Sequence, residues 1–170
     1  PGPRFDSVAP FMPERWLELE AYRPRVVVGE AADLERLLEQ VELGMLDLGC
    51  VNRALIVLTR YRARPMSDVS RLALWQGFGV PIFELYLGPD NGVLAAECGA
   101  HEGWHLEPGI DGWHYENELI VDGPGNYGLR TGLAATIETA ACPCGLATPR
   151  LVNIEAIKRV AWPRRLAASA

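Results

Sequence analysis

The sequence predicts an α/β (α+β) domain, in which a small mixed sheet begins with a βαβ unit and continues as antiparallel hairpins carrying a zinc-knuckle-like Cys/His site. Three observations lead to this prediction. β-branched and apolar runs alternate with helical leucine patterns in the first half. Glycine-rich turns separate short strand patterns in the second half. Three of the four cysteines and two of the three histidines lie in two short stretches, 98–105 and 142–144.

The bulk composition is that of an ordinary globular protein. The chain has 170 residues, 49% of them hydrophobic and 22% charged, which is enough for one domain with a real core. A net charge of −6 argues against nucleic-acid binding, which needs Lys and Arg to neutralise phosphates. No apolar run is long enough to cross a membrane, and no secretory signal is visible. We therefore expect a cytoplasmic protein whose clustered thiols bind metal rather than form disulfides.

The predicted domain organisation has three parts. Residues 1–24 contain five prolines and are expected to form an extended arm with one short helix, Pro13 to Tyr22. Residues 25–162 form the single α/β domain. Residues 163–170 form a tail.

The βαβ unit follows from local patterns in the first half of the domain. A valine run at 25–29 predicts a strand, and leucines at helical spacing predict a helix from Ala31 to Leu43 that ends at Gly44. The apolar run 54–58 predicts a strand covered on both faces. Ser67 can cap a helix that Gly79 ends, and a strand at 80–87 then returns parallel to the previous one.

The second half of the domain is expected to consist of hairpins. The Gly-Pro-Asp-Asn-Gly turn at 88–92 predicts a return strand from Val93 to Cys98. Further predictions are a strand from Trp113 to Val121 and a hairpin of 127–131 with 134–139, whose exit presents Cys142 and Cys144. The segment 151–160 is expected to form a last strand or a short helix.

The two cysteine-containing stretches suggest a structural zinc site, because zinc prefers four thiolate and imidazole ligands in closely spaced pairs. Three of its ligands would be Cys98, Cys142 and Cys144. The fourth ligand is open on spacing alone. His101 suits a tight knuckle, and His105 suits a returning hairpin. Two further residues are expected to stay outside the site, the plain thiol Cys50 and the strand or loop residue His114.

Three segments read together resemble the late part of the large adenylating domain of AMP-forming ligases, most closely the phenylacetate–coenzyme A ligase type. They are "FGVPIFELYLGPDNGVLAAECGAHEGWH", "ELIVDGPGNYGLRTG" and "CPCGLATPRL", and the resemblance covers roughly residues 54–152. In that family a Glu-Cys…Leu-His stretch and a Cys-x-Cys-Gly follow the adenine-binding segment, and some members have zinc at the cysteines. The family's Leu-His aligns with Trp104-His105, so the resemblance favours His105 over His101 as the metal ligand.

The sequence departs from that family at the nucleotide-binding positions. The family's Tyr-Gly-x-Thr-Glu is Tyr-Leu-Gly-Pro-Asp at 86–90, without the threonine and glutamate. Leu133 occupies the place of the aspartate that holds the ribose hydroxyls. The phosphate loop and the C-terminal lid with its lysine have no counterpart. The resemblance therefore implies a truncated, degenerate relative that has lost adenylation.

The first functional hypothesis is a non-catalytic, zinc-stabilised accessory or protein-interaction module, with a protein partner or a second copy of the chain as a homodimer. The first alternative is a small zinc enzyme with a water on the metal and one of three carboxylates as general base: Glu97, Glu102 or Glu107. The second alternative is a small-molecule or acyl-binding protein that uses a remnant ligase pocket. The incomplete adenylation motifs favour the non-catalytic hypothesis.

Overall fold

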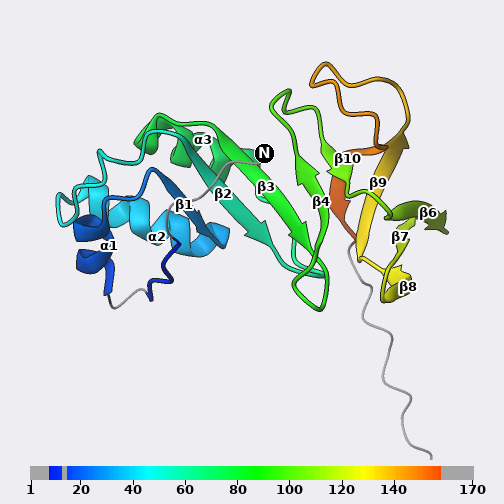
Figure 1. Cartoon of the computed structure of the whole chain (residues 1–170), viewed down its shortest axis with the longest axis horizontal. Coiled ribbons are helices and arrows are strands. Elements are labelled where there is room, and N and C mark those ends of the chain that lie inside the picture. Colours follow the sequence, from blue (N-terminus) through cyan, green and yellow to red (C-terminus); the bar gives the residue numbers. More distant parts are fainter. Residues whose placement is uncertain (1–7, 13–14, 158–170) are drawn as a thin grey trace, which may run out of the picture.

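The computed structural model describes residues 8–12 and 15–157. Its largest element is a seven-stranded sheet (Figure 1), whose strands run in the order β1 (Val26–Gly29), β2 (Ala54–Thr59), β3 (Ile82–Leu87), β4 (Val93–Glu97), β5 (Trp104–Leu106), β10 (Arg150–Ala156) and β9 (Leu133–Glu138). The first three strands are parallel, and every later neighbour in the sheet is antiparallel. The mixed α/β fold class predicted from the sequence is confirmed.

Helices α1 (Trp16–Tyr22), α2 (Ala31–Glu42) and α3 (Asp68–Phe78) lie with the parallel strands at one end of the molecule (Figure 1). The Ser67 hydroxyl accepts from the Ser70 backbone N–H at 3.1 Å, and Gly79 ends α3 with a φ of 65°. These are the predicted helix caps. A Cβ at Gly77 would lie 2.1 Å from the Leu38 side chain, so this glycine allows α2 and α3 to pack closely. No helix in the described ranges is long and apolar enough to cross a membrane.

A second, three-stranded sheet consists of β6 (Asp111–Tyr115), β7 (Glu118–Gly123) and β8 (Asn126–Arg130), all antiparallel. This sheet corrects two predictions. The segment predicted as one strand from Trp113 to Val121 is a hairpin, because the chain reverses at Glu116 (φ 55°) and Asn117. The predicted hairpin of 127–131 with 134–139 does not form, because β8 pairs with β7 and β9 pairs with β10.

Two hydrophobic clusters form the core. The first joins the helices to the parallel strands and is rich in leucines: Leu34, Leu37, Leu38, Leu55 and Leu74. The second begins at Tyr86 and lies among strands only, with members that include Leu94, Trp104, Leu106, Leu119, Leu133 and Leu151. Strand β3 contributes Ile82 to the first cluster and Tyr86 to the second, so it joins the two parts of the molecule.

The ends of several elements differ from the sequence predictions. The arm's helix is described from Trp16 onward, and positions 13 and 14 of the predicted helix lie outside the described residues. The segment predicted as a last strand or short helix is the strand β10, with residues 158–160 outside the description. Strand β5 was not predicted, because it has only three residues. The domain boundaries at 24/25 and 162/163 stay predictions, and the tail 163–170 lies outside the described residues.

Candidate metal centre

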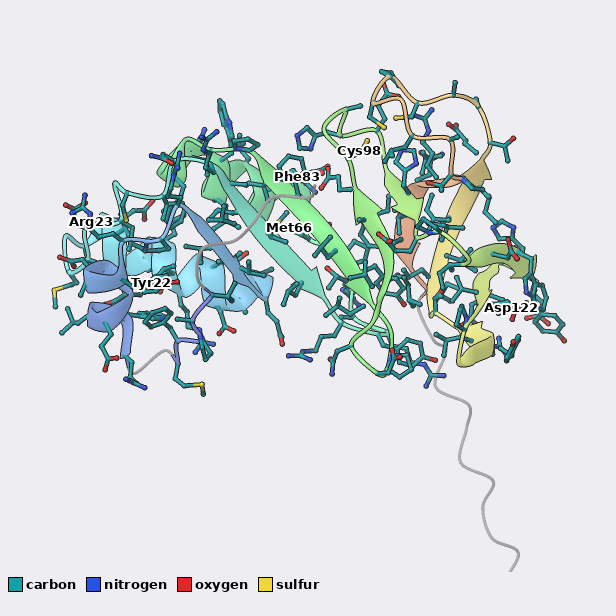
Figure 2. The ribbon with its side chains drawn as sticks, viewed as in Figure 1. Tyr22, Arg23, Met66, Phe83, Cys98 and Asp122 are labelled. Atoms are coloured by element: carbon teal, nitrogen blue, oxygen red, sulfur yellow. The ribbon has the colours of Figure 1, made fainter. Side chains whose placement is uncertain are left out.

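The four predicted ligand residues meet at one end of the large sheet. Cys98 follows the last residue of β4, and His105 is the central residue of the neighbouring strand β5. Cys142 and Cys144 lie in the loop that joins β9 to β10. That loop and the loop after β4 lie side by side in Figure 1, and Figure 2 labels Cys98 beside them. Residues 44 positions apart in the chain are thus brought into contact, as shown by the sulfurs of Cys98 and Cys142.

The distances within the cluster suit a tetrahedral zinc site. The Sγ atoms of Cys98 and Cys142 are 3.7 Å apart, and Cys144 Sγ is 3.5 Å from His105 Nε2. Zinc bonds of about 2.3 Å to sulfur and about 2.0 Å to nitrogen place two sulfurs about 3.8 Å apart, and a sulfur and a nitrogen about 3.5 Å apart. All four ligand atoms lie within 4.8 Å of one another, so a metal ion can be held among them.

The imidazole of His105 is buried and oriented for this role. Its Nδ1 lies 3.0 Å from the carbonyl oxygen of Thr148 and 3.2 Å from the Thr148 hydroxyl. Because a carbonyl oxygen only accepts, Nδ1 donates, and the proton-free nitrogen is Nε2, which faces Cys144. A ligand histidine commonly has its second ring nitrogen bonded in this way, which fixes both the tautomer and the ring orientation.

The Cys142–Leu146 turn directs backbone N–H groups toward the thiols. Gly145 has a φ of 84°, and its N–H donates to the Cys142 carbonyl at 2.9 Å. The Leu146 N–H lies 3.4 Å from Cys144 Sγ. The backbone N–H of Cys144, with further help from His105, lowers the pKa of the Cys142 thiol to about 6. The bond from the Leu146 N–H lowers the pKa of the neighbouring Cys144 thiol, but burial and the Cys142 thiol outweigh it, so that this pKa is raised. Cys142 is therefore the first of the two thiols to become a thiolate, the form that binds metal.

Arg150 connects the two loops that carry the ligands. It is the first residue of β10 and the register partner of His105. Its guanidinium donates to Glu102, in the loop after Cys98, and to Glu138, at the end of β9, both at 2.7 Å. The Arg150 side chain is only 11% exposed, whereas those of Glu102 and Glu138 are 49% and 40% exposed, so these charge-assisted bonds lie at the surface of the protein. The close approach of Gly103 to Leu151 also leaves no room for a side chain, since a Cβ there would lie 2.2 Å from the Leu151 carbonyl oxygen.

The remaining sequence candidates lie outside the cluster. His101 stacks on Phe83 with the ring centroids 5.0 Å apart, and its Nδ1 contacts Glu97 at 3.0 Å. His114 contacts the Ala135 carbonyl oxygen. Cys50 is partly buried against the first hydrophobic cluster.

The carboxylates proposed as general bases are not part of the metal-competent group, which the described residues form from three thiols and one imidazole. Glu97 accepts from Arg71 at 2.9 Å, and Glu102 accepts from Arg150. The backbone N–H of Glu107 donates to the Leu94 carbonyl, and its carbonyl accepts from the Ile110 N–H. Within the part of the chain that the structure describes, the group therefore consists of four protein donors with no carboxylate among them.

The residues at the positions that the resemblance assigns to nucleotide binding are buried or bonded within the protein. Tyr86 is 1% exposed, stacks on Trp104 with a centroid distance of 5.5 Å, and donates to the Thr131 carbonyl at 3.2 Å. Burial raises its pKa to about 12. Leu133 is fully buried. Asp90 accepts from the Gly92 N–H at 3.1 Å and thereby closes its own turn.

A buried polar network on β3 and β4 was missed by the sequence analysis. Glu84 is 2% exposed and accepts from Thr59 and from the Met66 N–H, and Arg71 reaches both Glu84 and Glu97. The sequence does contain a feature that could have indicated this network: Glu84 is the single charged residue in the apolar run 80–87.

Comparison with solved structures shows the fold of AMP-forming acyl-CoA ligases. 2-Hydroxyisobutyryl-CoA ligase in its postadenylation state matches 89% of this chain with 15% identity and a TM-score of 0.69. The amide bond synthetase McbA from Marinactinospora thermotolerans matches 85% with 18% identity and a TM-score of 0.55. An acyl-CoA synthetase (AMP-forming)/AMP-acid ligase II-like protein from Dyadobacter fermentans matches 75% with 13% identity and a TM-score of 0.51.

The chain spans only about a third of these ligases, 36%, 35% and 35% of their lengths respectively. No protein-family model and no curated protein matches the sequence. At these identities the likeness establishes the shared fold, as the resemblance of residues 54–152 implied.

Proposed function

We propose that this chain is a non-catalytic, zinc-stabilised module with the fold of part of an AMP-forming ligase, and that it acts through interaction with other proteins. The observation that carries the proposal is the closed set of donors: three cysteine sulfurs and one imidazole nitrogen within 4.8 Å of one another. A zinc ion with four protein ligands has no open position for water or substrate, so it contributes folding free energy rather than chemistry.

Two further features support a non-catalytic role. The position of the ribose-binding aspartate holds the fully buried Leu133, which offers no acceptor to a diol. Tyr86 is covered by Trp104 rather than presented to a nucleotide. The alternative of a zinc enzyme is weakened by the same geometry, since a catalytic site has three protein ligands and a bound water.

The metal part of the proposal is tested by the zinc content of protein purified without chelator. We expect about one equivalent of zinc per chain in the wild type, and almost none in Cys142→Ser, because one of four ligands is lost. Cys50→Ser is the matched control, since its thiol lies outside the cluster, and it should keep the full zinc content. Equal zinc content in the wild type and Cys142→Ser would overturn the metal proposal.

The non-catalytic part is tested separately with ATP, magnesium and 2-hydroxyisobutyrate, the acid named for the similar ligase. Pyrophosphate release should equal that of the protein-free blank, and an ATP analogue should show no saturable binding in the micromolar range. Zinc-dependent pyrophosphate release, or micromolar binding of the analogue, would show that the chain retains nucleotide chemistry.

A further inference from the structure

The three parallel strands of the large sheet carry helices on one face only. Strands β1, β2 and β3 are neighbours in chain order, so right-handed connections through α2 and α3 place both helices on the same face. The strand residues of the first hydrophobic cluster agree with this, because Val27, Leu55, Val57 and Ile82 all point to one side. Helix α1 belongs to the same cluster through Leu19. Within residues 8–12 and 15–157, no helix therefore covers the opposite side of these strands, which we call the second face.

The second face is entirely apolar. Its members follow from the strand register and from the alternation of side chains along each strand. They are Val26, Val28, Ala54, Ile56, Leu58, Phe83 and Leu85. None of them belongs to either hydrophobic cluster. Val28 is 53% exposed, and the other members are partly exposed. Phe83, labelled in Figure 2, stacks on His101 of the loop after β4, which marks the border of the second face toward the metal centre.

This composition is that of a sheet with a cover on each side. A sheet with one solvated face alternates apolar and polar residues, whereas parallel strands that are covered on both faces are apolar throughout. The run 54–58 is apolar at every position, and only its alternate members are buried under the helices. A contiguous apolar patch that stays exposed commonly marks a binding surface. The second face therefore calls for a covering element from outside the described residues.

Exposed arginines lie at both ends of the second face. Two precede β1 and β2 and two follow β2: Arg25, Arg53, Arg60 and Arg62. At the carboxyl ends of the strands, Glu30 pairs with Arg60, and Asp90 lies in the turn after β3. At the amino ends, the described ion pairs include neither Arg25 nor Arg53. The chain as a whole has a net charge of −6, so this positive rim does not follow from the composition. It favours an acidic occupant.

The chain itself offers no acidic apolar segment that fits. Residues 1–7 contain one large apolar side chain, Phe5, and residues 158–170 contain four basic residues and no acidic one. A second copy of the chain, packed face to face, would bring arginines against arginines in either strand orientation, because both ends of the second face carry them. Like charges in contact disfavour such a pairing.

We propose that an acidic amphipathic helix of a partner protein packs on the second face of β1–β3. Its apolar stripe covers Val28, Ile56 and Phe83, and its carboxylates pair with Arg25 and Arg53. The six residues of β2 span about 20 Å, which is the length of a helix of about 13 residues. The inference rests on the proposed function as an interaction module and deepens it, because it names the docking surface and the chemistry of the partner segment.

The test uses an amphipathic peptide of about 18 residues, long enough to be helical, with leucines on one face and glutamates on the other. One control peptide has lysine in place of glutamate, and a second is a scrambled version without the apolar stripe. Binding to the full zinc-loaded chain is followed by NMR titration of the backbone amides. We expect the glutamate peptide to shift amides of β1–β3 and to bind at least about tenfold more tightly than either control. Its affinity should fall as salt is raised, since part of the attraction is between charges.

Two pairs of variants locate the binding. Val28→Asp places a carboxylate under the apolar stripe and should weaken the glutamate peptide about tenfold or more. Its matched control is Val69→Asp, which changes a 79% exposed valine on α3 and should leave the affinity unchanged. Arg53→Glu should weaken the glutamate peptide about threefold and strengthen the lysine peptide. Arg36→Glu, an exposed change on α2, is its control and should alter neither.

Equal affinity for the three peptides, or no saturable binding up to the solubility limit of the glutamate peptide, would overturn the inference. So would a loss of affinity in Val69→Asp but not in Val28→Asp, because that would place the peptide on α3.

Two other occupants of the second face give results of their own, and each overturns the inference. A second copy would appear in analytical ultracentrifugation as a dimer that Val28→Asp dissociates. A cover by the chain's own first segment would appear as peptide binding only after residues 1–7 are deleted. Zinc content measured on the same samples separates these failures from a failure of the proposed function. A zinc-loaded chain that ignores the glutamate peptide contradicts only the inference, whereas a chain without zinc contradicts the metal proposal.

Discussion

The two ends of the molecule are each stabilised by different interactions. In the first, which we call the helical half (residues 15–82), three helices bury leucines against parallel strands. In the second, the strand half (residues 86–157), the described residues form no helix, and nearly all of the structure is short strands and loops. The hydrophobic cluster of the strand half has nine buried members against thirteen in the helical half. Small folds with limited cores commonly rely on a metal or other cross-link, and the cysteine cluster lies in the half with the smaller core.

Metal removal gives the largest expected effect and the sharpest test of this comparison. We expect a strong zinc chelator to lower the stability of the strand half by about 3 kcal/mol or more, on the order of 10 °C in the unfolding midpoint. Hydrogen exchange should show early loss of protection in β4, β5, β9 and β10, while α2 and β2 stay protected. Simultaneous loss of protection in both halves would show that the chain is one cooperative unit.

A matched pair of core substitutions gives the next largest effect. Leu34 in α2 and Leu106 in β5 are each 2% exposed, so Leu34→Ala and Leu106→Ala remove similar buried groups from the two halves. Each should cost about 2–5 kcal/mol in urea unfolding. Only Leu106→Ala, next to His105, should also weaken zinc in a competition with a chelator. Equal loss of zinc affinity in the two variants would contradict the separation of the halves.

The same contrast explains which parts of the fold were predictable from sequence. In the helical half, local signals decide the structure: Ser67 and Gly79 mark the ends of α3, and the leucine spacing of α2 identifies its buried face. In the strand half, the pairing partner of each strand is decided by distant residues. Thr131 shows this, because it lies between β8 and β9, where the chain passes from one sheet to the other. Its hydroxyl donates to the Leu119 carbonyl and accepts from the Leu133 N–H. No pattern within 127–139 contains that information.

The clustering of the three cysteines could be predicted from the sequence, whereas spacing alone did not decide which histidine lies beside them. Spacing along the chain allowed both His101 and His105, and the choice follows from the pairing of β5 with β4, which places His105 opposite Ala96 and near Cys98. His101 has a φ of 54° and its ring lies against Phe83 and Glu97 instead.

The smallest expected effect concerns Glu84, on the strand that joins the two halves. Burial raises the pKa of Glu84 above its ordinary value, partly offset by its bond from Thr59. Because the folded pKa is raised, the stabilising contribution is full below the ordinary value near 4.5 and is lost as the pH rises through the folded pKa. Glu84→Gln keeps an oxygen for Thr59 and Met66 and does not titrate.

The stability of Glu84→Gln relative to the wild type should therefore rise between about pH 4 and about pH 7, by an amount we expect to be small. Urea unfolding of both proteins across this range measures the difference, and metal loss at low pH cancels because both carry the same cluster. Thr136→Val, an exposed change on β9, controls for general effects of pH on unfolding. If the relative stability of Glu84→Gln instead falls with rising pH, the ion pair with Arg71 lowers the pKa of Glu84 more than burial raises it. The ionised carboxylate of Glu84 would then stabilise the strand that connects the two halves.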